Sequence, residues 1–479
     1  MLFNSLEFAV FFPVVCALYF LVPRSLKTPL LLVASCGFYM AFIPAYILIL
    51  FTTILVDYFA GIWIERSAGP RKKRLLWISI VVTCLILFVF KYFYFFTDTF
   101  AMISTAAGWP VWEPALKIIL PIGLSFHTFQ SLSYVIEVYR GEQKAERDFI
   151  TYATYVMFFP QLVAGPIERP QNLLHQFHEV HGFDHDRVVS GLRRMAWGFF
   201  KKLVVADRLA LYVNDVYAAP HHHNGLQLTI ATVFFAYQIY CDFSGYSDIA
   251  IGSARVLGFK LMENFDRPYQ STSISEFWRR WHISLSTWFR DYVYFPLGGS
   301  KVARSKWVRN ILITFGVSGL WHGAAWTYVA WGLLNGVYLV FGGMTKDFRD
   351  RCMGVFGLGH ATLPRRFVMW ITTFILIGVT WILFRAATFS DAWYIFTHLF
   401  AGWDLGAIKT QNFQLKHFPA AILGIALLEG LQYAERRWKV SQKLVSLPSV
   451  ARWPAYASVV VFVILFGVYQ SAQFIYFQF

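Results

Sequence analysis

The segment 308–341, VRNILITFGVSGLWHGAAWTYVAWGLLNGVYLVF, decides the fold class of this chain. One membrane-spanning helix needs about 20 apolar residues, and this segment is much longer. Basic residues lie on both sides of it, and such residues collect on the cytoplasmic side of a membrane. We therefore predict a hairpin of two membrane helices with its turn in the outer half of the membrane. The flanking basic residues are Lys301, Arg304, Lys306 and Arg309 before the segment and Lys346, Arg349 and Arg351 after it.

His322 lies inside this predicted hairpin, about 13 residues beyond Arg309, or about 20 Å at the rise of an α-helix. An ionisable side chain at that depth is costly and is a functional hypothesis by default. Burial favours the neutral imidazole, which can accept a proton. A histidine that hydrogen-bonds to a neighbouring helix fits the same position, so both interpretations stay open. Gly319 and Gly323 flank His322 and permit a bend or the close approach of another backbone.

The composition extends the membrane interpretation to the whole chain of 479 residues, of which 57% are hydrophobic and 14% are charged. A soluble domain is nearer one quarter charged, so the composition disfavours a soluble globular class. The net charge of +15 comes from short basic segments between apolar runs, and no separate basic domain indicates a nucleic-acid partner. The five cysteines are scattered without metal-site spacing, and we predict no metal.

The apolar runs predict an all-α, polytopic membrane protein with about ten to twelve transmembrane helices in a single domain, residues 1–479. Pro44 divides one long run into two helices. The segment Phe149–Ile167 contains Pro160 and Pro166 and predicts a re-entrant element. The other predicted spans are Phe8–Val22, Pro29–Ile64, Leu75–Phe96, Ala115–Tyr139, Leu226–Phe259, Val308–Phe341, Phe367–Phe384, Phe418–Leu431 and Tyr456–Phe474.

Two further segments carry charges inside apolar sequence. Arg193–Arg208 mixes Lys201 and Lys202 with aromatic residues, which predicts an interfacial helix. Leu226–Phe259 contains Asp242 and Asp248 on either side of Gly245. We predict a broken span whose second helix restarts after Gly245 and is capped by Ser247 or Asp248. A proton relay through the two aspartates is the alternative role.

A second histidine occurs in SEFWRRWHISLSTWFRDYVYFPL, residues 275–297. Taken as one helix, this segment is amphipathic, Glu276 and Arg280 can pair at i,i+4, and His282 lies at the edge of the apolar stripe. It is either an interfacial helix or a helix that covers a cavity, with His282 pointing inward and arginines that meet an anionic ligand. The stripe consists of Phe277, Trp281, Leu285, Trp288 and Tyr292.

Five motifs together resemble the membrane-bound O-acyltransferase superfamily. The likeness runs along nearly the whole chain and is concentrated in a core at residues 115–345. The branch is the bacterial one that includes the membrane subunit of alginate O-acetyltransferase, and teichoic-acid D-alanylation subunits are more distantly similar. The motifs are LPIGLSFHTFQSLSYVIEVYRG (120–141), FFPQLVAGPIERP (158–170), YCDFSGYSDIAIG (240–252), NFDRPYQSTSISEFWRRWHISLSTWFRDYVYFPLGG (264–299) and SGLWHGAAWTYVAWGLLNG (318–336).

The resemblance implies an all-helical fold around a central tunnel, with His322 as the catalytic base and His282 as the second histidine of the site. Candidate substrate-binding residues in the two histidine motifs are Trp321, Trp278, Arg279, Arg280 and Arg290. An arginine is suited to the phosphates of coenzyme A or to an acidic carrier protein.

The resemblance further implies transfer of an acyl group, which we expect to be acetyl, across a bacterial cytoplasmic (inner) membrane. The donor is a cytoplasmic thioester such as acetyl-CoA, with no bound cofactor, and the acceptor is an exported polysaccharide such as alginate. Expected partners are a periplasmic acetyltransferase that completes the transfer, membrane lipid and, as a further candidate, an acyl-carrier protein. D-alanyl transfer and a transporter or flippase built around Asp242 and Asp248 are the alternatives.

Overall fold

The computed structural model describes residues 1–111, 118, 120–163, 165–355, 357, 362–469 and 474–475. Every regular element among these residues is a helix, which confirms the predicted all-α class. The helices form two compact units, Met1–Met195 with Ile249–Glu263, and Ala196–Asp248 with Asn264–Phe479. The assignment of residues 1–479 to one acyltransferase domain stays a prediction.

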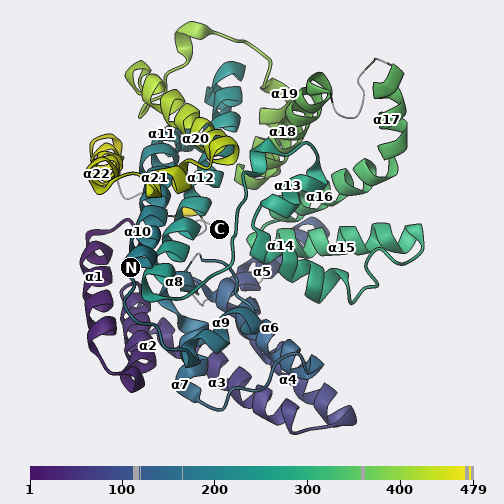
Figure 1. The fold of residues 1–479 in the computed structure, drawn as a ribbon. Coiled ribbons are helices and arrows are strands. Elements are labelled where there is room, and N and C mark those ends of the chain that lie inside the picture. The colour runs from purple at the N-terminus through teal and green to yellow at the C-terminus, as the bar shows by residue number, and fades with distance from the viewer. Residues whose placement is uncertain are drawn as a thin grey trace. The chain divides into compact units, whose positions relative to one another are not determined.

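The first unit contains the helices of the N-terminal part of the chain (Figure 1). Pro44 lies between α2 and α3, so the predicted division of that apolar run is confirmed. Residues 115–117 and 119 of the predicted span Ala115–Tyr139, and residue 164 of the re-entrant segment, lie outside the described residues. The elements are α1 (Leu6–Leu21), α2 (Arg24–Met40), α3 (Tyr46–Glu65), α4 (Gly69–Leu87), η1 (Phe88–Tyr92), α5 (Phe93–Ala107), α6 (Leu124–Arg140), α7 (Phe149–Met157), α8 (Phe159–Leu162), α9 (Pro170–Leu173), η2 (Leu174–His178) and the start of α10 (His185–Phe199).

Helices α3, α4 and α6 pack together through small and polar side chains. A Cβ atom at Gly61 of α3 would lie 2.7 Å from the ring of Tyr134 on α6, so only glycine leaves room for that ring. The buried carboxylate of Asp57 accepts hydrogen bonds from Ser79 at 2.6 Å and from Thr83 at 3.2 Å, both on α4. These bonds satisfy a carboxylate that would otherwise be costly to bury.

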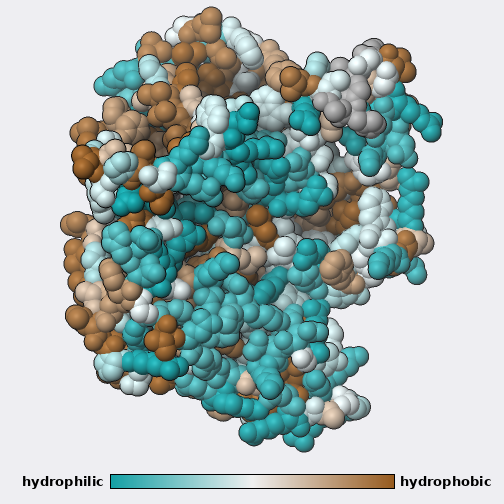
Figure 2. Space-filling view, in the orientation of Figure 1, coloured by the Kyte–Doolittle hydropathy of each residue, from teal (hydrophilic) through white to brown (hydrophobic). Residues whose placement is uncertain are grey.

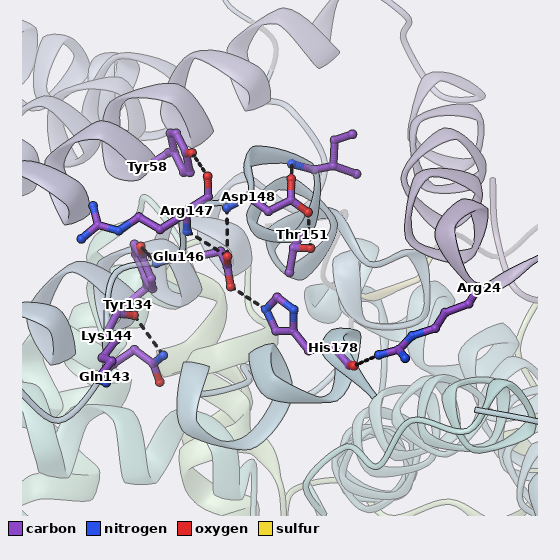
Figure 3. A network of polar contacts seen from close by, with 11 residues as sticks. Arg24, Tyr58, Tyr134, Gln143, Lys144, Glu146, Arg147, Asp148, Thr151 and His178 are labelled. Carbon is purple, nitrogen blue, oxygen red and sulfur yellow. Dashed lines mark hydrogen bonds and ion pairs between the residues drawn. The ribbon is translucent and has the colours of Figure 1, made fainter. Parts of the chain in front are cut away.

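A polar network holds the loop between α6 and α7 (Figure 3). The Glu146 carboxylate accepts hydrogen bonds from the backbone N–H groups of Arg147 and Asp148, at 2.8 and 2.9 Å. It also lies 2.8 Å from Nε2 of His178, an exposed side chain. The backbone carbonyl of His178 in turn accepts from Arg24 at 2.9 Å. We call these five residues the Glu146 network.

The second unit contains the remaining helices and both motif histidines. The chain passes between the units within α10, within α12 and between Glu263 and Asn264. The elements are η3 (Phe200–Ala206), α11 (Asp207–Ala218), η4 (Pro220–His222), α12 (Gly225–Leu257), η5 (Pro268–Gln270), α13 (Ile274–Arg280), α14 (Ile283–Phe289), η6 (Arg290–Tyr294), α15 (Arg304–His322), α16 (Trp326–Met344), α17 (Lys346–Val355), α18 (Leu363–Arg385), α19 (Phe389–His398), η7 (Leu405–Ala407), η8 (Leu415–His417), α20 (Phe418–Trp438), α21 (Val440–Val445) and α22 (Ser449–Phe466).

Helices α15 and α16 lie side by side and form the hairpin predicted over residues 308–341 (Figure 1). A Cβ atom at Gly319 would lie 2.2 Å from the carbonyl oxygen of Tyr328, and one at Gly332 would lie 2.2 Å from that of Phe315. The two backbones therefore touch at these glycines, which confirms the expected close approach. His322 is the last residue of α15 and lies directly before the turn.

The predicted break at Gly245 is wrong, because α12 is continuous from Gly225 to Leu257. A Cβ atom at Gly245 would lie 2.9 Å from the carbonyl oxygen of Gly198 and 3.2 Å from the backbone nitrogen of Lys202. The glycine thus permits close packing of α12 against the chain around η3, and it does not end the helix.

The interfacial role predicted for Lys201 and Lys202 is also wrong, because both side chains are buried. Nζ of Lys202 lies 2.8 Å from Oδ1 of Asp207 and 2.6 Å from Oδ1 of Asp242. Nζ of Lys201 pairs with Asp248. These two lysines and three aspartates, which we call the lysine cluster, explain why the aspartates of α12 are neither caps nor helix breakers.

Four helical segments of the described chain have the length and hydropathy of a membrane span: Tyr46–Glu65, Gly69–Ala107, Leu363–Arg385 and Ser449–Phe466. The chain is therefore a membrane-embedded protein, while the total of ten to twelve spans stays a prediction. Figure 2 shows apolar side chains at the surface of α1 and of α22. The exposed apolar residues are Leu6, Val10, Val14, Leu18 and Leu21 on α1, and Val459, Val460, Val461, Ile464 and Leu465 on α22.

Candidate active site

His282 lies at a break between two short helices. The prediction of one helix over residues 275–297 is wrong, because α13 ends at Arg280 and α14 begins at Ile283. His282 has φ 43° and ψ 56°, the left-handed region, which costs a residue other than glycine about 1–2 kcal/mol. The predicted apolar stripe nevertheless faces the core, since Phe277, Trp281 and Leu285 are buried.

The rings of His282 and His322 lie close together inside the second unit. Their centroids are 6.4 Å apart, and the two residues are 1% and 3% exposed. Trp321 lies beside both rings, with its centroid 5.0 Å from that of His322 and 6.1 Å from that of His282. Two histidines separated by about forty residues thus share one buried position.

Aromatic residues complete the surroundings of the two histidines. The His322 ring contacts Trp331 at 5.0 Å and Phe384 at 5.6 Å, and the His282 ring contacts Phe243 at 4.6 Å. Sequence reasoning missed Trp331, Phe384 and Phe243 as neighbours of the site. Trp331 follows His322 inside the same motif, which was the available signal. The other two come from distant segments, α18 and α12, and only the fold brings them here.

The hydrogen bond of His282 identifies which ring nitrogen carries the proton. The backbone N–H of Leu285 donates to Nδ1 of His282 at 3.4 Å. An accepting Nδ1 carries no proton, so in the neutral ring the proton is on Nε2. His282 lies between α13 and α14, and each of these helices has seven residues and is too short to span a membrane. Burial of the His282 imidazole lowers its pKa to about 3. The imidazole is therefore neutral near pH 7 and offers a donor, Nε2–H.

The other predicted site residues divide into two groups. Trp321 and Trp278 belong to the aromatic surroundings, and the Trp278 ring lies 5.7 Å from that of Trp331. Nε1 of Trp278 is buried and has no acceptor among the residues that the structure describes.

Of the three predicted arginines, two are paired with acidic neighbours and one is exposed. Arg280 pairs with Glu276 at 2.6 Å, which confirms the predicted i,i+4 pair. Arg290 pairs with its neighbour Asp291 at 2.7 Å. Arg279 is exposed. Their assignment to substrate binding stays a prediction.

The ring contacts described above surround the two imidazoles with indole and phenyl side chains. In the part of the chain that the structure describes, no group of three or more His, Cys, Asp or Glu side chains is arranged to hold a metal ion. The arrangement can accept a proton at one imidazole and donate a hydrogen bond from the other, which is the equipment of general acid–base chemistry.

Comparison with known proteins identifies relatives over most of the chain. Residues 140–386 match the model of MBOAT, the membrane-bound O-acyltransferase family. The "Probable alginate O-acetylase AlgI" of Pseudomonas aeruginosa is 38% identical over 86% of this chain and 78% of its own length. The "Peptidoglycan O-acetyltransferase" of Helicobacter pylori is 32% identical over 82% of this chain and 78% of its own length. The "Teichoic acid D-alanyltransferase" of Bacillus subtilis is 28% identical over 47% of this chain and 60% of its own length.

Proposed function

Because the chain belongs to the membrane-bound O-acyltransferase family and is an O-acyltransferase, we propose that it serves the O-acetylation of an exported polysaccharide such as alginate. The donor is a cytoplasmic acyl thioester, acetyl-CoA or another, and the membrane is the bacterial inner membrane. The observation that carries the chemistry is the buried pair of His282 and His322, with ring centroids 6.4 Å apart. The names of two relatives, which refer to alginate and peptidoglycan, support a polymer of the cell envelope as acceptor.

In this proposal His322 is the general base. It takes the proton of the acceptor hydroxyl while the hydroxyl oxygen forms a bond to the carbonyl carbon of the thioester. The tetrahedral intermediate then collapses, the carbon–sulfur bond breaks, and the imidazolium returns the proton to the leaving thiolate. The products are an ester and a free thiol. A base in this position contributes about 10²–10⁴-fold to the rate.

His282 is assigned the complementary role of stabilising the intermediate. Its Nδ1 accepts the N–H of Leu285, which places the proton of the neutral ring on Nε2, and in the reaction this Nε2–H donates to the oxyanion. The low pKa of His282 supports this role, because a neutral ring keeps the same donor across the physiological pH range. Trp321 and Trp278 bind the substrate through ring contact, and the buried indole N–H of Trp278 is a further donor for it.

Charge contacts guide the donor toward the site in this proposal. Arg279 is exposed and forms no ion pair within the described residues, so it is the arginine best able to bind a phosphate of coenzyme A or an acidic acyl-carrier protein. Arg280 and Arg290 must first leave Glu276 and Asp291. Beyond the membrane, a periplasmic acetyltransferase receives the acetyl group and completes the transfer.

Two alternatives have less support. D-alanyl transfer rests on a relative that is 28% identical over 47% of this chain. A transporter or flippase would use Asp242 and Asp248, but these carboxylates are already paired with Lys202 and Lys201. A proton or cation that used this route would have to break a buried ion pair first.

The test is acyl transfer by purified protein in nanodiscs, with labelled acetyl-CoA, alginate oligosaccharides and the periplasmic acetyltransferase that completes the transfer. His322→Ala lowers the rate of thiol release and label transfer by about 10²–10⁴-fold. His221→Ala, at a half-exposed histidine away from the site, is the matched control. An unchanged rate for His322→Ala rejects the base assignment. Transfer from a D-alanyl thioester alone, or substrate counterflow in liposomes without transfer, favours the corresponding alternative.

A further inference from the structure

The break that carries His282 is held by a neighbouring extended segment. The backbone N–H of Asp266 donates to the carbonyl of Arg280 at 2.9 Å, and the N–H of Ile283 donates to the carbonyl of Asn264 at 2.9 Å. These two bonds lie on either side of Trp281 and His282. The chain therefore cannot continue as one helix through residues 281 and 282, since both ends of the break are bonded to the same segment.

The side chain of Asn264 adds bonds at the same place. Its Oδ1 accepts from the hydroxyl of Ser284 at 2.9 Å and from the backbone N–H of Ser284 at 3.3 Å. Its Nδ2 donates to the hydroxyl of Ser247 on α12 at 3.1 Å. Asn264 is fully buried, as are Ser247 and Ser284. The amide is therefore held at both ends, with its oxygen directed to the start of α14.

The first turn of α14 divides its N–H groups between Asn264 and His282. The first N–H groups of any helix have no partner within the helix and need an acceptor from outside. At α14 the N–H of Ile283 is taken by the carbonyl of Asn264, and that of Ser284 by its Oδ1. The third, from Leu285, is taken by Nδ1 of His282. His282 is thus the N-cap of α14, and Asn264 accepts the first two backbone N–H groups of that helix.

We propose that Asn264 is a positioning residue for His282, which it holds in the left-handed backbone conformation and, through Leu285, in the form that carries its proton on Nε2. The inference rests on the proposed function, in which Nε2–H of His282 stabilises the oxyanion. Without the amide, the N–H of Ser284 loses its acceptor, and only the two backbone bonds of Asn264 and Asp266 remain to hold His282 in its unfavourable backbone conformation. The ring then leaves the orientation that the reaction uses.

The deciding experiment is a double-mutant cycle with Asn264→Ala and His282→Ala, measured as acetyl transfer by the full-length protein in nanodiscs. Asn264→Ala alone lowers kcat by about 10–100-fold and leaves the KM for acetyl-CoA within about twofold, because the lost interaction acts in the transition state. In the His282→Ala background the same substitution lowers kcat by less than about twofold, since the residue through which it acts is gone.

Asn310→Ala is the matched control. Asn310 is also fully buried in the second unit, and its Nδ2 donates to the carbonyls of Leu297 and Gly299 at 3.0 and 3.2 Å, away from α14. We expect Asn310→Ala to change kcat by the same factor whether residue 282 is histidine or alanine. If Asn264→Ala behaves like Asn310→Ala in the cycle, the role of Asn264 is structural and the inference is wrong.

Asn264→Asp supplies a second readout that a purely structural role does not give. A protonated aspartic acid reproduces the amide, with its carbonyl oxygen accepting from Ser284 and its hydroxyl donating to Ser247. We expect this variant to exceed Asn264→Ala in rate and, relative to the wild type, to lose rate as rising pH ionises the carboxyl. If the rate of Asn264→Asp divided by that of the wild type does not change with pH, the inference is wrong. An unimpaired His282→Ala variant instead rejects the proposed role of His282 itself.

Discussion

The Glu146 network of the first unit and the lysine cluster of the second use similar chemistry in different surroundings. His178 in the Glu146 network is 55% exposed as a side chain, and the carboxylate of Glu146 is 12% exposed. In the lysine cluster, the side chains of Lys202, Asp207 and Asp242 are 1%, 3% and 4% exposed. Water can therefore replace a lost partner in the first case but has almost no access in the second.

This difference teaches what each network can do for the fold. An exposed ion pair contributes about 0–1 kcal/mol, because solvent and salt screen it. A buried pair gives little net stability compared with apolar residues, yet removal of one partner is severe because the other charge stays buried. The lysine cluster is therefore stable only when all its charged partners are present. Two of its aspartates, Asp242 and Asp248, lie on α12, the helix that also supplies Ser247 to Asn264.

The largest effect is expected from Lys202→Met, which leaves two carboxylates buried without their shared ammonium group. We expect the free energy of unfolding to fall by about 3–5 kcal/mol, measured by titration with SDS in mixed micelles. Lys202→Met combined with Asp207→Leu and Asp242→Leu is the matched variant, because it removes the charges together. If the single substitution costs less than about 1 kcal/mol, the cluster is as solvent-accessible as the Glu146 network and the comparison fails.

The lysine cluster also shows where prediction from the sequence ended. Local features were predictable: the α15–α16 hairpin from its length and flanking charges, and the Glu276–Arg280 pair from its spacing. Lys201 and Lys202 were assigned to an interface because each segment was judged alone. Their partners Asp242 and Asp248 lie on another helix, and only the packed fold makes one charge neutralise the other.

The site shows the same limit. His322 and His282 were predicted from their motifs, but the break at His282 was not, because the amphipathic pattern of residues 275–297 fits a single helix. The bonds that impose the break come from the segment of Asn264 and Asp266, and Asn264 lies 20 residues before Ser284. Propensity and periodicity describe a segment by itself, and a long-range bond to a backbone group overrides both.

A smaller effect is expected from Glu146→Gln in the first unit. The carboxylate accepts two backbone N–H groups and lies against His178, and a glutamine keeps one acceptor oxygen without the charge. Hydrogen bonds to a charged acceptor contribute about 1.5–3 kcal/mol, so the partial loss should lower the free energy of unfolding by about 1 kcal/mol in the same SDS titration. A loss as large as that of Lys202→Met would show that exposure does not separate the two networks.

His178→Asn should have a still smaller effect on the free energy of unfolding, below about 1 kcal/mol. The side chain meets Glu146 at the surface, and water can replace it as the partner of that carboxylate. The same SDS titration tests this expectation. A loss above about 2 kcal/mol would contradict it, because an exposed partner that water replaces cannot contribute that much.

The smallest effect is expected at the pair of Arg280 and Glu276, which shares the second unit with the lysine cluster but is about one fifth exposed on each side. If exposure decides the energy, a double-mutant cycle with Arg280→Gln and Glu276→Gln gives a coupling of about 0.3–0.5 kcal/mol, close to that of other i,i+4 pairs. A coupling energy above about 2 kcal/mol would mean that the location of the pair in the second unit, and not the exposed fraction of its side chains, sets the strength of the interaction. The same variants separate stability from substrate binding: if Arg280 meets the donor, Arg280→Gln raises the KM for acetyl-CoA, whereas Glu276→Gln releases the guanidinium and lowers it.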